Sequence, residues 1–363
     1  MLGIIIGIVG LLIVVSVVFL TCPNFGQVPK GKSLERIKKS PNYYDGSFHN
    51  KHVTPQLTSG KSYFATAIDF LFTKKERLRP ERELPVIQSD LWQMNREDDW
   101  LVWFGHSSYL LQVDGIRVLV DPVFIESSPL PFYNKPFKGP DLFCPKDIPE
   151  VDFLVISHDH WDHLDYKTVI ALKDRMGKII CGLGVGEHFR RWGFDENRII
   201  ELDWDENMVF SNKLSVYCFP TRHFSGRGFS PNQSLWASYL IEFPSRKIYI
   251  GGDGGYDDRF TSIGEKFKDI DLAIMENGQY DENWKYIHLF PKQIIQAFQN
   301  LNAKTLFTVH HSKYTLANHP WDKPLNDIYS LAEDNFIPLL LPMIGEWVNL
   351  SDTIHPVKRW WDN

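Results

Sequence analysis

The chain has 363 residues, of which 43% are hydrophobic, so it is long enough for one large domain with a buried core and extensions. Its formal net charge of -6 comes from interspersed acidic and basic residues, which argues against a nucleic-acid partner. Its 4 cysteines include no C-x-x-C pair, which argues against a disulfide scaffold and against a thiolate zinc site.

Residues 1–22 are expected to form a membrane anchor. The segment 2–20 has no charged side chain and is long enough to span a bilayer once as a helix. Basic residues follow between Lys30 and Lys39, and the positive-inside tendency then places the downstream chain in the cytoplasm. Two alternatives stay open, a cleaved secretory signal and a lipoprotein modified at Cys22. We favour the uncleaved anchor, because the residues before Cys22 lack the small side chains that such processing requires.

Residues 23–90 are interpreted as a linker and N-terminal extension. This segment mixes Pro, Lys and Ser with little periodicity. Within it, residues 62–72 fit a short amphipathic helix, and the charged run 74–85 has the composition of a solvated surface. A pattern of apolar strands begins at Asp99, so we place the main domain at 91–350 and a C-terminal tail at 351–363.

Residues 99–124 are predicted to form a strand, a turn and a second strand. The sequence Val113-Asp114-Gly115-Ile116 is typical of a hairpin turn, and Asp121 ends the second strand. His106 lies in a Gly-His-Ser-Ser turn after an apolar run, where a histidine has a structural role, supports a ligand or contacts substrate. Asp121 is placed to orient a metal-binding histidine through its ring N–H.

The loop 125–143 is long and rich in proline and aromatic residues. Its prolines disfavour a helix and hold the chain extended. Because the loop leaves the strand that ends at Asp121, we expect it to pass over the rim of a site. Phe132 and Phe137 then either meet a lipid surface, with Lys135 near phosphate, or close the core beneath the rim, which is the commoner fate of such rings.

The run 151–165, VDFLVISHDHWDHLD, places metal-binding side chains at the end of an apolar strand. Side chains two apart in an extended segment point the same way, so His158 and His160 can share one ion. Asp162 and His163 come where a helix begins and can turn to a second ion, about 3.5–4 Å away. Imidazole and carboxylate ligands favour zinc or a neighbouring first-row metal. A polar turn without metal is disfavoured, because crowding these groups without a cation is costly.

The other candidate residues also follow apolar strands. The predicted strand in 215–227 ends in His223, that in 247–258 leads to Asp253, that in 271–291 precedes His288, and that in 303–320 ends in His310. In layered α/β folds, sites are assembled at the edge where such strands end. A helix is expected from Pro291, whereas the glycines of 178–189 do not have the spacing of a dinucleotide-binding loop.

The order of these residues resembles that of the metallo-β-lactamase superfamily. A closer resemblance is carried by the segments FGHSSYLLQ (104–112), VLVDPVF (118–124), ISHDHWDHLDYKTVIAL (156–172), IIELDWDEN (199–207), PTRHF (220–224), GGDGGY (251–256) and LFTVHHSKYTLANHP (306–320). With these segments the chain is similar, over about residues 80–350, to N-acyl-phosphatidylethanolamine phospholipase D and its bacterial relatives. The ascorbate-6-phosphate lactonase group shares the Gly-His-Ser start.

The resemblance implies an α/β (α+β) fold, a four-layer αββα sandwich in which two sheets face each other with helices outside. It also implies two zinc ions, other first-row divalent metals being possible. In the pattern of this family, His158, His160 and His223 hold one ion, Asp162, His163 and His310 hold the other, and Asp253 bridges both.

The same resemblance assigns roles in catalysis. A hydroxide between the ions would be the nucleophile, because metal coordination lowers the pKa of water to about 7. Asp162 and His310 are the expected catalytic residues, His288 and His106 the expected substrate contacts, and Asp121 an outer support of the ligands. Asp162 is also expected to orient the hydroxide.

The activity implied by the resemblance is a phosphodiesterase of phospholipase D type that acts on N-acyl-phosphatidylethanolamine-like lipids at a membrane. Two departures keep other substrates open: His311 stands where the phospholipase has an aromatic residue, and residues 291–298 fit the relatives loosely. The alternatives are a lactone or a soluble cyclic phosphodiester, then a β-lactam, and a metal-binding scaffold without turnover. The sequence carries no signal of oligomeric state.

Overall fold

The computed structural model describes residues 10, 14, 16, 18–73, 75–130, 132–211, 213–352 and 356–362. Most of the predicted anchor, residues 1–22, therefore lies outside the described residues. Within the described part of the chain, no helix combines the length and the apolar character needed to cross a membrane.

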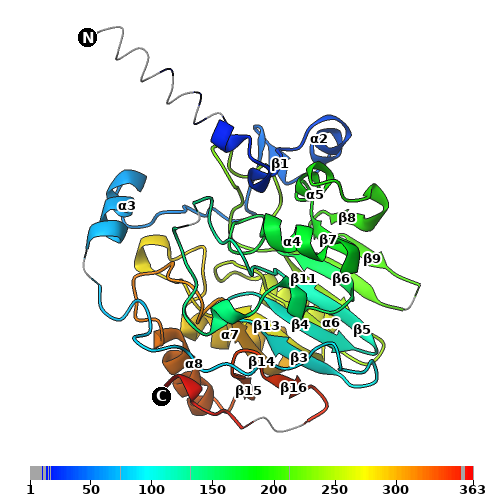
Figure 1. The fold of residues 1–363 in the computed structure, drawn as a ribbon, viewed down its shortest axis with the longest axis vertical. Coiled ribbons are helices and arrows are strands. Elements are labelled where there is room, and N and C mark those ends of the chain that lie inside the picture. Colours follow the sequence, from blue (N-terminus) through cyan, green and yellow to red (C-terminus); the bar gives the residue numbers. More distant parts are fainter. Residues whose placement is uncertain are drawn as a thin grey trace.

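Two sheets of seven strands form the centre of the fold (Figure 1). The first has the order β16 (Trp347–Asn349), β3 (Trp100–Trp103), β4 (Tyr109–Val113), β5 (Ile116–Val120), β6 (Val151–Ile156), β7 (Met176–Gly182) and β8 (Ile199–Leu202). The second has the order β15 (Leu339–Leu340), β14 (Ala303–Val309), β13 (Ile270–Glu276), β12 (Lys247–Ile250), β11 (Ala237–Glu242), β10 (Ser215–Pro220) and β9 (Asn207–Val209).

The two sheets share one hydrophobic core. The ring of Phe307 on β14 lies 6.2 Å from the rings of both Trp103 on β3 and Tyr109 on β4. The hydroxyl of Tyr239 on β11 donates to the backbone oxygen of Ile156 on β6 at 3.1 Å. These contacts across the interface confirm the predicted arrangement of two facing sheets.

Helices cover the outer faces of both sheets, as expected for four layers. The helices that follow strands of the first sheet are α4 (Tyr166–Leu172) and α5 (Gly186–Arg191), and α5 contacts β8. Those that follow strands of the second sheet are α6 (Arg259–Phe267), α7 (Pro291–Leu301) and α8 (Lys323–Asp334); α7 contacts β13 and β14, and α6 and α8 both contact α7. The predicted helix start at Pro291 is confirmed, since proline occupies the first turn of α7. The short helix predicted at 62–72 is α3 (Tyr63–Phe72).

The strand directions explain where a site can form. In the first sheet β5 to β8 are parallel, and in the second β12 to β15 are parallel. Strand β10 also runs with β12, because each is antiparallel to β11. The carboxyl ends of these parallel strands meet at one edge of each sheet, and that edge is where α/β folds assemble sites.

The hairpin predicted at Val113–Ile116 joins β4 to β5, and Val113 pairs with Ile116. Its two turn residues, Asp114 and Gly115, both have positive φ, 50° and 74°. This conformation matches the right-handed twist of the two strands and is the reason that Asp-Gly is favoured there.

The segment predicted as a linker and N-terminal extension packs onto the domain. It contains α2 (Gly31–Ile37), β1 (Tyr43–Tyr44) and β2 (Ser47–Phe48), and Figure 1 shows α2 and β1 beside α5 and β8. The side chains of Ile37 and Phe48 are buried in the hydrophobic core. Arg36 of α2 donates to the backbone oxygen of Glu201 on β8 at 2.8 Å.

Candidate metal centre

The structure brings together the candidate ligands at the carboxyl ends of the parallel strands. They come from the loop after β6, which carries His158, His160, Asp162 and His163, and from single residues after β10, β12 and β14, which are His223, Asp253 and His310. Their ligand atoms form overlapping groups in which all members lie within 4.8 Å of one another.

The first group consists of His158, His160 and His223. Nδ1 of His160 lies 2.8 Å from Nε2 of His158 and 3.3 Å from Nε2 of His223. His223 donates from Nδ1 to the backbone oxygen of Ile287 at 2.9 Å, which leaves its Nε2 toward the other two rings. Burial lowers the pKa of His158 and His223 well below the usual value, so both rings stay neutral and keep a lone pair for a cation.

The second group contains Asp162, His163 and His310, together with His106. Asp253 lies between the two groups, because its Oδ2 is 3.2 Å from Nε2 of both His163 and His310 and 3.9 Å from Nε2 of His223. Asp253 is therefore the carboxylate that reaches both sets of imidazoles.

The electrostatics of Asp253 fit a cation. Its burial alone would raise the pKa, but the positive field of His163 and His310 lowers it well below the usual range. Its Oδ1 is buried and, among the described residues, has no hydrogen-bond partner. A buried carboxylate oxygen without a donor is costly unless a metal ion occupies that side.

Asp121, which was predicted to orient a metal histidine, contacts Nδ1 of His163 at 2.8 Å. Its carboxylate also accepts from the backbone N–H and the hydroxyl of Ser157, at 2.8 and 2.6 Å. An Asp121 carboxylate held in this way fixes the ring of His163 so that Nε2 points to Asp253.

His106 and His288 occupy different positions around the centre. His106 is fully buried, its Nε2 contacts Oδ2 of the candidate ligand Asp162 at 2.9 Å, and it is not among the residues that line the open cavity. His288 does line the cavity, and its Nδ1 contacts Glu276 at 2.7 Å. The carboxylate of Glu276 raises the pKa of His288, while burial raises that of Glu276 to about 7.

Two acidic residues beside the centre, Glu276 and Asp159, are not among those predicted from the sequence. Glu276 is the last residue of β13. It could have been predicted in the same way as His310, since both are polar residues at the end of an apolar strand. Asp159 stands between two candidate ligands and, by the alternation of an extended segment, points away from them. It accepts from Ser234 at 2.8 Å and from the backbone N–H of Gly226 at 2.7 Å.

The centre opens into two adjoining cavities. A cavity of about 370 Å³ is lined by His160, Asp162, His223, Asp253, His288 and His310, together with Trp284 and Leu316. A second cavity, of about 670 Å³, shares His160, Asp162, Trp284 and Leu316 with the first and continues along Pro129, Leu130 and Tyr133.

The loop 125–143 thus borders the site, as was expected for its rim. Phe132 and Phe137 of this loop differ in burial. Phe137 is 2% exposed and belongs to the core, whereas Phe132 is 73% exposed.

Comparison with known proteins agrees with this fold. Residues 116–311 match the family described as Beta-lactamase superfamily domain. The chain is 35% identical over 331 residues to an uncharacterized protein of Mycobacterium tuberculosis, which covers 89% of this chain and 88% of that protein. It is 29% identical over 254 residues to N-acyl-phosphatidylethanolamine-hydrolyzing phospholipase D 1 of Caenorhabditis elegans, which covers 64% of this chain and 70% of the relative.

Solved structures are similar in fold. An isothiocyanate hydrolase from Delia radicum gut bacteria aligns with a TM-score of 0.54 at 18% identity, over 69% of this chain and 98% of that one. A possible metal-dependent hydrolase from Veillonella parvula aligns with a TM-score of 0.54 at 17% identity, over 69% of this chain and 99% of that one.

Proposed function

Because this chain belongs to the β-lactamase superfamily and has the fold of its metal-dependent hydrolases, we propose that it is a two-zinc phosphodiesterase of phospholipase D type. Its proposed substrates are N-acyl-phosphatidylethanolamine-like lipids, in keeping with its similarity to enzymes named for that reaction.

The observation that carries the lipid substrate is the apolar cavity beside the metal centre. Its volume of about 670 Å³ is in the range of small-molecule sites, and it begins at His160 and Asp162. Beyond these two residues its lining is mostly apolar: Leu57, Pro129, Leu130, Tyr133, Trp161, Trp284 and Leu316. A lipid substrate would place its phosphodiester at the candidate ligands and its acyl chain along the apolar cavity.

The proposed zinc ligands are His158, His160 and His223 for one ion and Asp162, His163 and His310 for the other, with Asp253 shared. Zinc held there supplies Lewis acidity toward a phosphoryl oxygen and lowers the pKa of water.

Two residues of the cavity have proposed roles toward substrate and water. Asp162, oriented by His106, is placed to accept a proton from the attacking water. His288 donates a hydrogen bond from Nδ1 to Glu276. A protonated ring can then donate from Nε2 to a phosphate oxygen.

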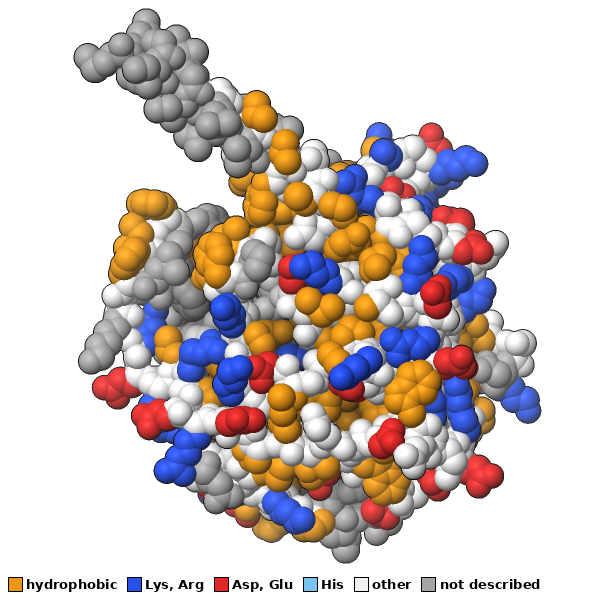
Figure 2. Space-filling model, viewed as in Figure 1, with side chains coloured by type: hydrophobic (Ala, Val, Ile, Leu, Met, Phe, Trp, Pro, Cys, Tyr) orange, Lys and Arg blue, Asp and Glu red, His pale blue; other side chains and the backbone are white. Residues whose placement is uncertain are grey.

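A membrane contact is part of the proposal. Phe64, Ile68 and Phe72 repeat at helical spacing on α3 and are exposed, as is Phe132 of the loop. Figure 2 shows hydrophobic side chains gathered around α3, on the side of the molecule where the described chain begins. An apolar rim beside a lipid-sized cavity suits the surface of a bilayer, and we keep the cytoplasmic location inferred from the basic flank of the anchor.

The test is to load the purified chain with zinc and assay it on N-acyl-phosphatidylethanolamine in mixed micelles, with bis-p-nitrophenyl phosphate and a lactone as comparisons. Release of phosphatidate and N-acylethanolamine, with two zinc ions per chain by elemental analysis, is the expected result. Turnover of the lactone or of a cyclic phosphodiester, with the lipid left intact, would favour the alternative substrates. Zinc binding without turnover of any ester would contradict an enzymatic role.

A further inference from the structure

The histidines of the first group come from two loops, one after β6 and one after β10. Residues of the N-terminal extension are hydrogen-bonded directly to the loop after β10 and, through other side chains, to the loop after β6. The ring contacts of the second group come from a different part of the chain. His163 and His310 are supported by Asp121 and Ser107, which belong to the sandwich itself.

The side chain of Asn50 holds the backbone of His223 at both polar groups. Its Oδ1 accepts from the N–H of His223 at 3.2 Å, and its Nδ2 donates to the backbone oxygen of His223 at 2.7 Å. Trp236 donates from Nε1 to the same Oδ1 at 3.1 Å, which fixes the orientation of the amide. The backbone that carries this histidine is therefore tied to one side chain 173 positions away in the sequence.

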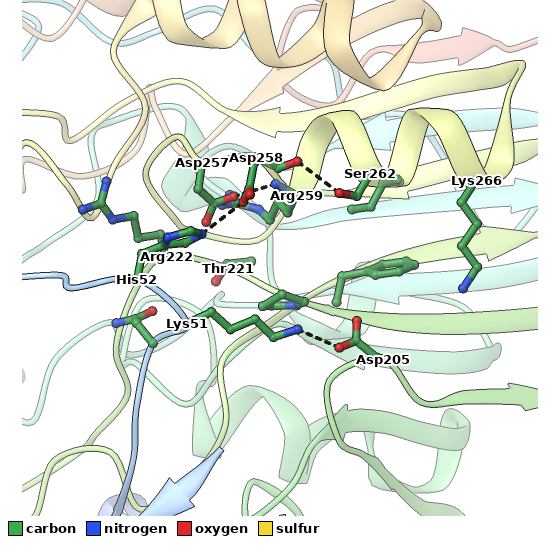
Figure 3. A pocket seen from close by; sticks show the side chains of 14 residues that line it. Lys51, His52, Asp205, Thr221, Arg222, Asp257, Asp258, Arg259, Ser262 and Lys266 are labelled. Atoms are coloured by element: carbon green, nitrogen blue, oxygen red, sulfur yellow. Dashed lines mark hydrogen bonds and ion pairs between the residues drawn. The ribbon is translucent and has the colours of Figure 1, made fainter. Parts of the chain in front are cut away.

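The extension on the C-terminal side of Asn50 is itself fixed to the domain. Lys51 pairs with Asp205 at 2.7 Å and His52 with Asp258 at 3.0 Å. Figure 3 shows Lys51 and His52 lining a pocket together with Thr221 and Arg222, the two residues before His223. Arg222 also donates to the backbone oxygen of Val53 at 2.8 Å. These contacts fix the position of Asn50 beside the loop that carries His223.

Arg227 connects the beginning of the extension to the loop after β6. The residue is 5% exposed, and its guanidinium donates to the backbone oxygens of Asp159 and Leu164, at 2.9 and 2.6 Å. It also donates to the backbone oxygen of Asn24, at 3.1 Å from Nε and 2.8 Å from Nη2. The guanidinium carbon lies 4.0 Å from the centroid of the Trp161 ring.

A second connection runs through Asp159. Gln27 donates its backbone N–H to Nδ1 of His188 at 2.9 Å, and Nε2 of His188 contacts Asp159 at 3.0 Å. Asp159 accepts in turn from the N–H of Gly226. The extension is therefore connected through His188 to Asp159, which lies in the loop of His158 and is hydrogen-bonded to the loop of His223.

We propose that the N-terminal extension positions the His158–His160–His223 cluster for metal binding, with Asn50 and Arg227 as the positioning residues. This inference rests on the proposed function in one respect, the assignment of these three histidines to an ion. It makes the extension a part of one metal site, whereas the rings of His163 and His310 in the second group are held by Asp121 and Ser107 of the sandwich.

The test compares Asn50→Ala with Asn42→Ala in the full chain. Asn42 lies in the same extension and is also half-buried, but its side chain donates to Asp203, and no hydrogen bond between described residues joins that side chain to either loop. The apo proteins are titrated with zinc against a chromophoric chelator, and melting temperatures are measured in parallel. We expect Asn50→Ala to weaken one of two zinc-binding steps by about tenfold, as other outer contacts of ligands do, and Asn42→Ala to change neither.

Three further variants separate positioning from general stability. Asn50→Asp keeps the oxygen that accepts from His223 and should fall between Asn50→Ala and the unchanged chain. Arg227→Lys should weaken the same step as Asn50→Ala. Arg198→Lys should not, although Arg198 also donates to backbone oxygens, those of Gly177, Lys173 and Met176. Cobalt in place of zinc reports the same change as an altered absorption of one bound ion.

The outcomes distinguish the two proposals. If the unchanged chain binds no zinc, the proposed function fails and this inference fails with it. If the unchanged chain binds two ions and both Asn50→Ala and Arg227→Lys bind them equally well, the inference alone is wrong. Equal weakening of both steps, or the same effect from Asn42→Ala, would also contradict it.

Discussion

The carboxylate of Asp121 accepts a hydrogen bond from Nδ1 of His163 at 2.8 Å, and this contact turns Nε2 of the same ring toward Asp253, 3.2 Å away. One buried carboxylate after β5 thus sets both the tautomer and the direction of a candidate ligand in the loop after β6.

Replacing Asp121 by Asn should weaken metal binding, because the amide has lost the charge that holds the proton on Nδ1 of His163. We expect the affinity for one of the two ions to fall by about tenfold to a hundredfold. The measurement is zinc competition with a chelator. Asp141→Asn is the matched control, since Asp141 pairs with exposed Lys138. An unchanged affinity would remove Asp121 from the support of the centre.

The ligands and the residues around them should differ in their effect on hydrolysis. Asp162→Asn and His310→Ala should each lower turnover by more than about a hundredfold while leaving the circular dichroism spectrum intact. His288→Ala removes one hydrogen bond to a charged group, and we expect a loss of about tenfold to a hundredfold. Equal losses at His288 and Asp162, with both ions retained, would mean that these roles are assigned wrongly.

Stability should depend on pH through Lys313. This residue is 1% exposed, its Nζ donates to the backbone oxygens of Phe104 and Val123, and burial lowers its pKa from 10.5 to about 7. Between these two pH values the unfolded chain binds more protons than the folded one at this side chain, so its contribution to the free energy of unfolding rises with pH.

Denaturant unfolding at several pH values tests this assignment. Lys313→Met should flatten the rise of the free energy of unfolding between about pH 7 and pH 10. Lys146→Met, at an exposed position, should leave the slope as it is. If the slope is the same in Lys313→Met, the buried lysine is not its source.

Phe132 and Phe137 should respond in opposite ways to replacement by Ser. Phe137→Ser should lower the free energy of unfolding by about 3 kcal/mol or more, because it empties a core position. Phe132→Ser should leave the melting temperature unchanged and weaken binding to phospholipid vesicles and turnover of lipid. Turnover of bis-p-nitrophenyl phosphate is the control and should not change in Phe132→Ser. Unaltered vesicle binding would contradict a lipid contact at this loop.

The orientation in the membrane is tested by a reporter fused after Asn363. A cytoplasmic catalytic domain gives a signal only from a reporter active inside the cell. Activity outside the cytoplasm, or a mature chain beginning near Cys22, would contradict the proposed anchor.

The strand-end histidines could be predicted from the sequence because each of them follows an apolar run. Such a run predicts a buried strand, and the residue after it then lies at the end of that strand. His223 and His310 come together because parallel strands end at one edge, and that follows from the fold. Asn50 gave no such signal. It recognises a backbone N–H and C=O, which every residue except proline offers, and it does so from a segment without periodicity. A side chain that binds only backbone groups of a distant residue produces no pattern of side chains in the sequence.

The packing of the N-terminal extension decides where the chain can be shortened for biochemical work. Removing residues 1–22 would leave Pro23 to Gln27, with their contacts to Trp192, Arg227 and His188, in place. A cut at residue 91, just before the first strands of the main domain, would remove the buried ring of Phe48 from the core and the two hydrogen bonds of Asn50 to the backbone of His223. A fragment that begins there would keep every candidate metal ligand, so a loss of metal binding or activity in it would report the missing extension and not the ligands themselves.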